Sequence, residues 1–371
     1  MSNNTSPPLR LRAGEWVQVR TKEEILNTLD VNGRMDELPF MPEMLRYCGM
    51  TMRVGKRAHK TCDPAVGIIG RRMASTVHLE NIRCDGSAHD GCQAGCLIFW
   101  KEAWLKRLDG EPASQVSSGN QVSSGNQVSS GHKVSSGNEA RPEREYTEDA
   151  LRSAVKRPLA PGDSTPIYVC QNTQIKFATE PLSPWDVRQY LEDYTSGNVP
   201  LSRLAAGLLY FLWRTIADAG LGIGSAMRWI YDVFQRAIGG SPYPGRPSGL
   251  PKDLQTPRAL LDLQQGELVR VKPFHEILKT VDANYRNRGL SFDAEMVPYT
   301  ERQYEVDRRV TQIIDEKTGK MLWIKADAII LKNVVCEARY AFCRRFCPRA
   351  IFPYWREIWL ERVSQDPHDH D

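Results

Sequence analysis

The feature that most constrains the fold is an internal repeat. Residues 14–84 align without a gap with residues 266–336, at a constant offset of 252. The segment GEWVQVR meets GELVRVK, and EILNTLDVN meets EILKTVDAN. Self-similarity of this length indicates that one structural unit occurs twice. We therefore expect two similar halves on either side of a region of different character.

Each copy begins with an alternating strand, at 16–19 and at 268–271, whose apolar residues fall on one face. A short helix follows, and in the first copy Thr21 and Glu24 form a capping box. More short strands come next, including a predicted hairpin at 313–323. Short strands around one helix resemble an SH3-like barrel, and this resemblance implies a small, strongly bent sheet. The predicted fold class is α+β, with two small SH3-like β-barrel domains joined by a mainly helical middle module.

The chain divides into seven predicted parts. They are a disordered N-terminus at 1–13, the first repeat at 14–110, a linker at 111–142, a middle module at 143–240, a second linker at 241–262, the second repeat at 263–363 and a polar tail at 364–371. Serine and glycine dominate the first linker, whose VSSG units are typical of a flexible segment. The middle module is predicted to hold a hairpin at 166–178 and helices at 184–195, 201–218 and 224–237.

Three closely spaced cysteines occur near the end of each repeat. The first set has the spacing C-x7-C-x3-C and the second C-x6-C-x3-C. Each set is followed by two tryptophans one helical turn apart, in WKEAWLKRL and WREIWLERV, so each repeat is predicted to end in a helix. Three thiols crowded into so few residues, twice, are hard to explain by packing. They are typical of metal or cluster ligands.

Two four-cysteine sites account for eight of the nine cysteines. The predicted sets are Cys62, Cys84, Cys92 and Cys96 for the first site, and Cys170, Cys336, Cys343 and Cys347 for the second. Within the first copy Cys62 is the best fourth ligand. The second copy holds Ile314 at this position and has only three cysteines of its own, so Cys170, the one cysteine outside the repeats, is assigned to it. An alternative leaves the second site with three thiolates and an open position. Cys48 is interpreted as an ordinary buried cysteine.

An iron–sulfur cluster is the first candidate for these sites, with two [4Fe–4S] centres. Structural zinc sites usually take cysteines in short C-x2–4-C turns, whereas the intervals here include six and seven residues. Pro348 directly follows Cys347, as proline follows the last ligand of ferredoxin-type runs. The alternative is a structural zinc protein that acts as an interaction scaffold, with His59, His78 or His89 completing a mixed site. The predicted function is a metal-binding protein with a redox or biosynthetic role and a protein partner of that kind.

The charge pattern, the apolar runs and the absence of catalytic motifs give weaker indications of function. The net charge of +4 and basic clusters such as 53–60 allow nucleic-acid binding, but interleaved acidic residues favour a solvated surface. The N-terminus has no apolar signal segment, and the longest apolar run, 204–213, is too short for a membrane span. A cytoplasmic location is therefore expected. No known catalytic motif occurs, so whether the chain is an enzyme stays open.

Overall fold

The structure is a computed structural model that describes residues 8–63, 69–108, 110, 146–157, 164–220, 222–246, 250–251 and 254–363. The hexapeptide linker, residues 1–7 and the tail lie outside this part. Residues 8–13 do not form the disordered segment predicted for them. Leu11 is fully buried, and its backbone N–H donates to Glu102 Oε1 at 2.9 Å. The folded unit therefore begins before the recognisable repeat.

A five-stranded antiparallel sheet forms the N-terminal half, in the order β8-β7-β4-β1-β9. The strands are β1 (Trp16–Val19), β4 (Thr51–Arg57), β7 (Thr76–Leu79), β8 (Trp100–Lys101) and β9 (Leu105–Arg107). Small elements fill the loops: α1 (Lys22–Leu26), β2 (Arg34–Met35), β3 (Leu38–Pro39) and the 3₁₀ helices η1 (Pro42–Tyr47), η3 (Ser87–His89) and η4 (Glu102–Trp104). The capping box of Thr21 and Glu24 is present at the start of α1, as predicted.

The C-terminal half has a four-stranded sheet in the order β17-β14-β11-β18. Its strands are β11 (Leu268–Val271), β14 (Gln303–Arg309), β17 (Ile329–Leu331) and β18 (Leu360–Arg362). The other elements are α7 (Phe274–Ile277), β12 (Arg286–Asn287), β13 (Leu290–Ser291), β15 (Gln312–Ile314), β16 (Met321–Trp323) and the 3₁₀ helices η5 (Leu278–Thr280), η6 (Ala294–Tyr299), η7 (Phe342–Arg344) and η8 (Glu357–Trp359). The predicted hairpin is confirmed, since β15 pairs with β16.

Equivalent strands pair in the same register in both halves. Trp16 faces Arg53, and Leu268 faces Glu305, which are the same positions at the offset of 252. The register shifts at the same place as well, between Val54 and Lys56 and between Val306 and Arg308. Within the described residues these sheets are small and open, and none closes into a barrel. The mixed α and β content is as predicted, whereas the closed barrels are not present.

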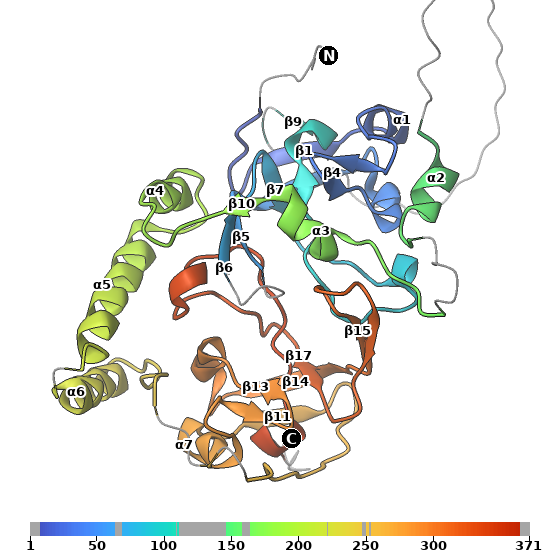
Figure 1. Cartoon of the computed structure of the whole chain (residues 1–371). Coiled ribbons are helices and arrows are strands. Elements are labelled where there is room, and N and C mark those ends of the chain that lie inside the picture. Colours follow the sequence, from blue (N-terminus) through green and yellow to red (C-terminus); the bar gives the residue numbers. More distant parts are fainter. Residues whose placement is uncertain are drawn as a thin grey trace, which may run out of the picture.

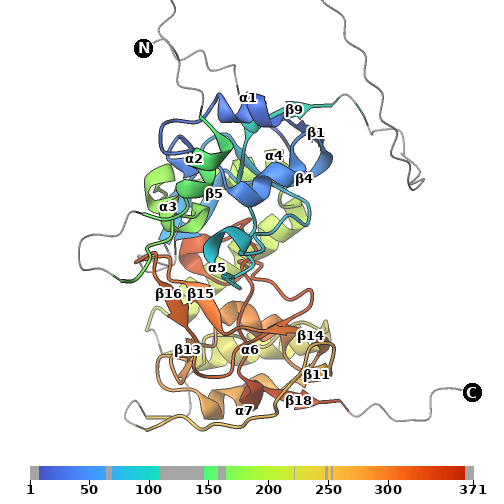
Figure 2. The same cartoon turned by 90° about the vertical axis from the view of Figure 1, so that its right-hand side faces the viewer.

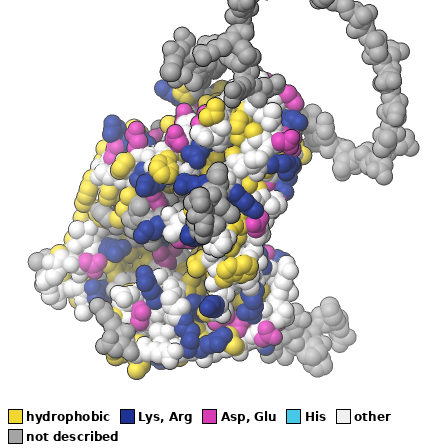
Figure 3. All heavy atoms as spheres, turned by 45° about the vertical axis from the view of Figure 1, so that its right-hand side comes forward, with side chains coloured by type: hydrophobic (Ala, Val, Ile, Leu, Met, Phe, Trp, Pro, Cys, Tyr) yellow, Lys and Arg dark blue, Asp and Glu magenta, His cyan; other side chains and the backbone are white. Residues whose placement is uncertain are grey.

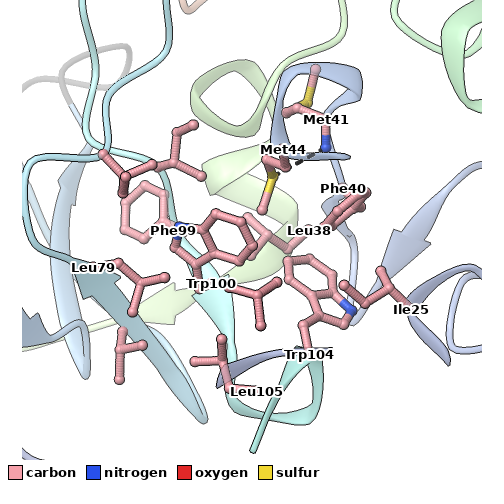
Figure 4. Close-up of a cluster of buried hydrophobic side chains, with 14 of the residues drawn as sticks. Ile25, Leu38, Phe40, Met41, Met44, Leu79, Phe99, Trp100, Trp104 and Leu105 are labelled. Atoms are coloured by element: carbon pink, nitrogen blue, oxygen red, sulfur yellow. Dashed lines mark hydrogen bonds between the residues drawn. The ribbon is translucent and has the colours of Figure 1, made fainter. Parts of the chain in front are cut away.

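Each tryptophan pair belongs to the core of its own half. Trp100 and Trp104 are fully buried and meet Phe40 edge to face, with centroids 6.3 and 5.1 Å away (Figure 4). Trp355 and Trp359 surround Phe292 in the same way. The segment between the tryptophans is a 3₁₀ turn that leads into β9 or β18, so the predicted terminal helices are wrong. The residues after the second tryptophan of each pair form a strand with β1 or β11, and this pairing outweighs the helical spacing of the tryptophans.

The middle module is mainly helical, as predicted. It contains α2 (Glu148–Ser153), α3 (Gln171–Ala178), the edge strand β10 (Glu180–Pro181), α4 (Arg188–Thr195), α5 (Leu201–Ala217) and α6 (Gly224–Ala237). The predicted hairpin at 166–178 is wrong, because its second strand is α3. Thr173 explains the difference, since its hydroxyl accepts from the N–H of Cys170 at 3.0 Å and caps the helix. Figure 1 shows α4, α5 and α6 along one side of the molecule, from one half to the other.

Each half reaches across to the other with one hairpin (Figures 1 and 2). The hairpin of β5 (Lys60–Asp63) and β6 (Ile69–Arg72) lies against η7 of the C-terminal half. A Cβ atom on Gly70 would lie only 2.6 Å from the Cys343 carbonyl oxygen. In return, the β15–β16 hairpin contacts the first cysteine loop, where the N–H of Gln93 donates to the Gln312 carbonyl at 3.0 Å. The two cysteine loops therefore lie at the contact between the halves.

Acid should weaken the N-terminal half through His78. This side chain is buried, and burial lowers its pKa from 6.5 to about 4. The unfolded chain therefore binds a proton that the folded chain excludes, so stability falls as the pH drops from 6.5 towards 4. We expect the free energy of unfolding to fall by about 1.4 kcal/mol per pH unit in this range from His78 alone. Urea unfolding of wild type and His78→Asn at several pH values tests this, and equal slopes would contradict it.

Candidate metal centres

The first site contains four cysteines in one small cavity of about 40 Å³. Cys84, Cys92 and Cys96 come from the loop after β7, and Cys170 comes from the residue before α3. The loop is closed at its base, because the N–H of Cys84 donates to the Cys96 carbonyl at 2.8 Å. Ile314 of the crossing hairpin donates its backbone N–H to Cys92 Sγ at 3.3 Å. We call this group the N-site.

The second site gathers Cys62, Cys336 and Cys347. These three pack together with Ala338 and Ile351. Cys62 lies on β5, so the crossing hairpin of the N-terminal half brings it to the cysteine loop of the C-terminal half. The N–H of Cys336 donates to the Ile351 carbonyl at 2.7 Å, which closes this loop. We call this group the C-site.

Cys62 and Cys170 are therefore exchanged relative to the predicted ligand sets. Cys62 lies with the second triplet and Cys170 with the first. The physical reason is the exchange of hairpins, which carries each hairpin away from the cysteine loop of its own half. Ile314 occupies the position of Cys62 in the second copy and lies at the N-site, where it offers no thiol. Cys170 supplies the fourth thiol there instead.

Cys343 and Cys48 complete the set of cysteines. Cys343 lies in η7 beside β6 with its side chain exposed, and it is not among the cysteines that pack together at the C-site. Cys48 follows η1, packs at the edge of the N-terminal core and belongs to neither site. All nine cysteines are free thiols.

Burial keeps the thiols of Cys84, Cys96 and Cys170 protonated without a metal. It raises the pKa of Cys96 to about 12 and that of Cys170 to about 11, and it raises the pKa of Cys84 further. At the C-site, a hydrogen bond between the Cys62 and Cys347 thiols raises the pKa of Cys62 and lowers that of Cys347. A metal at either site must displace these protons, because thiolates are the ligands.

One buried arginine lies between the two sites. Arg349 is 2% exposed, donates to the Cys62 carbonyl at 2.9 Å and forms an ion pair with Glu316 at 2.5 Å. Its charge acts on the thiols of both Cys62 and Cys96. Arg344 adds a second cation beside Cys62 and Cys336. Four thiolates bring net negative charge, which nearby buried cations stabilise.

Glu43 is a residue of the N-site that the sequence prediction missed. Its carboxylate accepts from Cys84 Sγ at 3.2 Å, and its second oxygen, Oε2, is buried without a hydrogen-bond partner. Glu43, Cys84 and His89 place one possible ligand atom each within 4.8 Å of one another. The repeat contained a signal for this residue, because Glu295 stands at the same position in the second copy. Glu295 instead accepts three backbone N–H groups, from Arg339, Tyr340 and Ala341.

The spacing of the thiols distinguishes possible occupants. Across the described residues, which include all nine cysteines, no three sulfurs lie within 4.8 Å of one another. Tetrahedral zinc with Zn–S bonds of about 2.3 Å brings its sulfurs to about 3.8 Å from each other. In an iron–sulfur cluster the thiolates bind different iron atoms and stand farther apart. The thiol-rich donor set suits a cluster as well as zinc, and His59 and His78 lie outside the N-site cavity.

The basic clusters do not form a free cationic surface. Within 53–60, Arg57 pairs with Glu102 and Glu192, and Lys60 pairs with the buried Asp193. On the face shown in Figure 3, Lys and Arg side chains are interspersed with acidic ones. In the part of the chain that the structure describes, no helix has the length and apolar character needed to cross a membrane.

No protein-family model matches the chain, and comparison with curated proteins and with solved structures found no match.

Proposed function

We propose that this chain is an iron–sulfur protein with two cluster sites, the N-site and the C-site. The observation that carries the proposal is the source of one thiol at each site. Cys170 joins the complete first triplet at the N-site, and Cys62 joins Cys336 and Cys347 of the second triplet at the C-site. The two sites obtain this thiol from unrelated parts of the fold, although the triplets themselves are related by the repeat. Packing alone gives no reason for such a coincidence.

The surroundings of the thiols support a cluster over plain zinc. No three sulfurs of the described residues lie as close together as one tetrahedral zinc ion would hold them. Arg349 and Arg344 offset the negative charge that four thiolates and a cluster would bring. The backbone N–H of Ile314 donates to Cys92 Sγ, and such hydrogen bonds tune the reduction potential of a cluster. Bound clusters would supply one-electron chemistry, and the chain's own residues would set the potential and exclude water.

The position of Arg349 suggests how the two sites would work together. A single buried cation acts on thiols of both sites, so it would stabilise negative charge at either one. This arrangement supports a role in electron transfer, either to a redox protein partner or within a biosynthetic reaction. The substrate of such a reaction stays open.

Metal analysis tests the proposal directly. We expect protein purified without oxygen to be brown and to contain iron and sulfide in equal amounts, about four of each per cluster. Reduction with dithionite should bleach the visible absorption. Colourless protein with about one zinc per site and no sulfide would refute the cluster.

Zinc at the N-site is the second candidate, and one specific observation favours it. Glu43, Cys84 and His89 are buried and hold their ligand atoms within 4.8 Å of one another, a mixed donor set that zinc accepts. Glu43→Gln separates the two candidates. Zinc bound through Glu43 should be lost or weakened at least about tenfold, because the replacement removes an anionic ligand. A cluster held by four cysteines should keep its iron and sulfide.

A further inference from the structure

The helical hairpin of α5 and α6 has its apolar side turned towards solvent. No residue of α6 is buried, and Trp229, Ile230, Val233 and Phe234 are all exposed. On α5, Leu208, Leu209 and Leu212 are exposed in the same way. A surface helix of a globular protein normally turns this side towards the core. The exposed side is therefore expected to face something other than water.

Some polar residues of both helices point inward instead. Arg203 forms an ion pair with Glu337 at 2.8 Å, and Arg214 donates to the Tyr340 carbonyl at 3.0 Å. On α6, Asp232 accepts from the backbone N–H of Tyr243 at 2.8 Å. These contacts fix the orientation of the hairpin on the loop before Cys347. The outward apolar side is thus a property of the folded molecule and is not relieved by rolling the helices over.

The charge of this segment favours an anionic surface. Residues 201–246 contain five arginines and two aspartates, a net charge of +3. Both aspartates are paired, Asp218 with Arg214 and Arg228 and Asp232 with Arg246, and Arg203 is paired with Glu337 outside this range. Arg236 is exposed at the end of α6 and forms no ion pair with another described residue. The apolar side itself offers few groups that a protein partner could hydrogen-bond.

Two further features fit lipid better than a rigid partner. A hollow of about 810 Å³, lined mainly by apolar side chains such as Trp213, Phe234 and Ile238, opens between the helices and residues 339–346. Acyl chains are deformable and fill an irregular hollow without a complementary shape. Trp185 and Trp229 are exposed on this side of the molecule, and tryptophan favours the boundary between headgroups and acyl chains.

We propose that α5 and α6 form a membrane-binding surface that lies in the headgroup region of a bilayer containing anionic lipids. The two helices insert their outward side chains and do not cross the bilayer, in the manner of interfacial amphipathic helices. Arg236, exposed at the end of α6, contacts the lipid phosphates. This proposal stands whether or not the cysteine sites bind a cluster, because it uses none of their residues.

Flotation of the full-length protein with vesicles tests the surface. We expect the protein to float with equimolar phosphatidylcholine and phosphatidylglycerol, and at least about fivefold more weakly with phosphatidylcholine alone. Salt should weaken binding to the anionic vesicles. The double variant Leu209→Glu/Trp229→Glu should bind at least about tenfold more weakly, because two apolar side chains that insert into the bilayer are replaced by charged ones. Both positions are exposed, so the variant should fold normally by circular dichroism.

Trp323→Glu is the matched control. Trp323 is 66% exposed, as Trp229 is at 67%, but it lies on β16 in the C-terminal half. We expect this variant to float like wild type. Absence of flotation in the wild type, or equal loss in both variants, would overturn the proposal. So would a wild-type dimer that does not float and that Leu209→Glu/Trp229→Glu converts to a monomer, since the surface would then bind a second copy.

Discussion

Cys62→Ser is expected to remove the cluster of the C-site and to leave the N-site loaded, although Cys62 belongs to the first copy of the repeat. Its thiol contacts Cys347, and its hairpin crosses to the C-terminal half. A serine hydroxyl is a far poorer ligand for iron than a thiolate. The iron and sulfide content should therefore fall to about half of the wild-type value. The remaining signal in electron paramagnetic resonance after reduction should be that of a single cluster.

Cys170→Ser should have the complementary effect. It should empty the N-site and leave the C-site, so that the spectra of the two variants add up to that of the wild type. Combining Cys62→Ser with Cys347→Ser should cost no more iron than Cys62→Ser alone, because both thiols serve one site. Combining Cys62→Ser with Cys170→Ser should remove all the iron.

Cys48→Ser is the control for these variants. Cys48 is a thiol of the same half that lies outside both sites, so its loss should leave iron and sulfide unchanged. The assignment of Cys62 to the C-site and Cys84 to the N-site is wrong if Cys62→Ser and Cys84→Ser affect the same spectroscopic signal. The cluster proposal fails if neither Cys62→Ser nor Cys170→Ser changes the metal content.

The exchange of Cys62 and Cys170 marks the limit of what the sequence could predict. The repeat and the two triplets are local patterns, and comparison of the chain with itself was sufficient to find them. The fourth ligands depend on where two hairpins go after they leave their sheets. Gly70 against the Cys343 carbonyl and Gln312 against Gln93 decide this, and such contacts join residues more than two hundred positions apart. No periodicity within one segment encodes them.

Local patterns also failed where pairing between strands competes with helical spacing. Trp100 and Trp104 are spaced as on a helix, but Leu105 pairs with Val19 in the sheet. For α3 the failure ran the other way, because the Thr173 cap was not recognised and a strand was predicted. The long helices α5 and α6 were predicted almost to the residue. Their uninterrupted apolar pattern needed no tertiary contact to be recognised, although which side would face solvent could not be read from it.

One surface pair shows how closely the two halves correspond. Arg53 and Glu80 form an ion pair across β4 and the end of β7, at 3.6 Å. The same two positions in the second copy hold Glu305 and Lys332, which also pair, with the charges reversed. Both partners have changed sign together, so the contact is the same although the residues differ. Because the charges are reversed, a comparison of residue types does not show that the two ion pairs are equivalent. Their equivalence is visible once the register of the two halves is known.

Two buried glutamates are expected to show the largest effects on stability. Glu102 accepts from the N–H groups of Arg10 and Leu11, at 3.0 and 2.9 Å, and from Arg57. Glu357 takes the same role in the second copy, where it binds three N–H groups at 261–263 and Arg309. Removing either carboxylate leaves several backbone N–H donors without a partner and takes one acidic partner from Arg57 or Arg309.

Glu102→Ala and Glu357→Ala should therefore each lower the free energy of unfolding by about 3–5 kcal/mol, because two or three backbone N–H donors lose a charged, fully buried acceptor. Urea unfolding followed by circular dichroism measures the change. Glu80→Ala and Glu305→Ala are the matched controls, because each removes one partner of the exposed, charge-reversed pair and should cost less than about 1 kcal/mol. Since each half holds the cysteine loop of the other through its hairpin, both large variants should lower one common transition. Separate transitions would show that the two halves unfold independently. A loss of unfolding free energy no larger than in the controls would show that these carboxylates do not stabilise the halves.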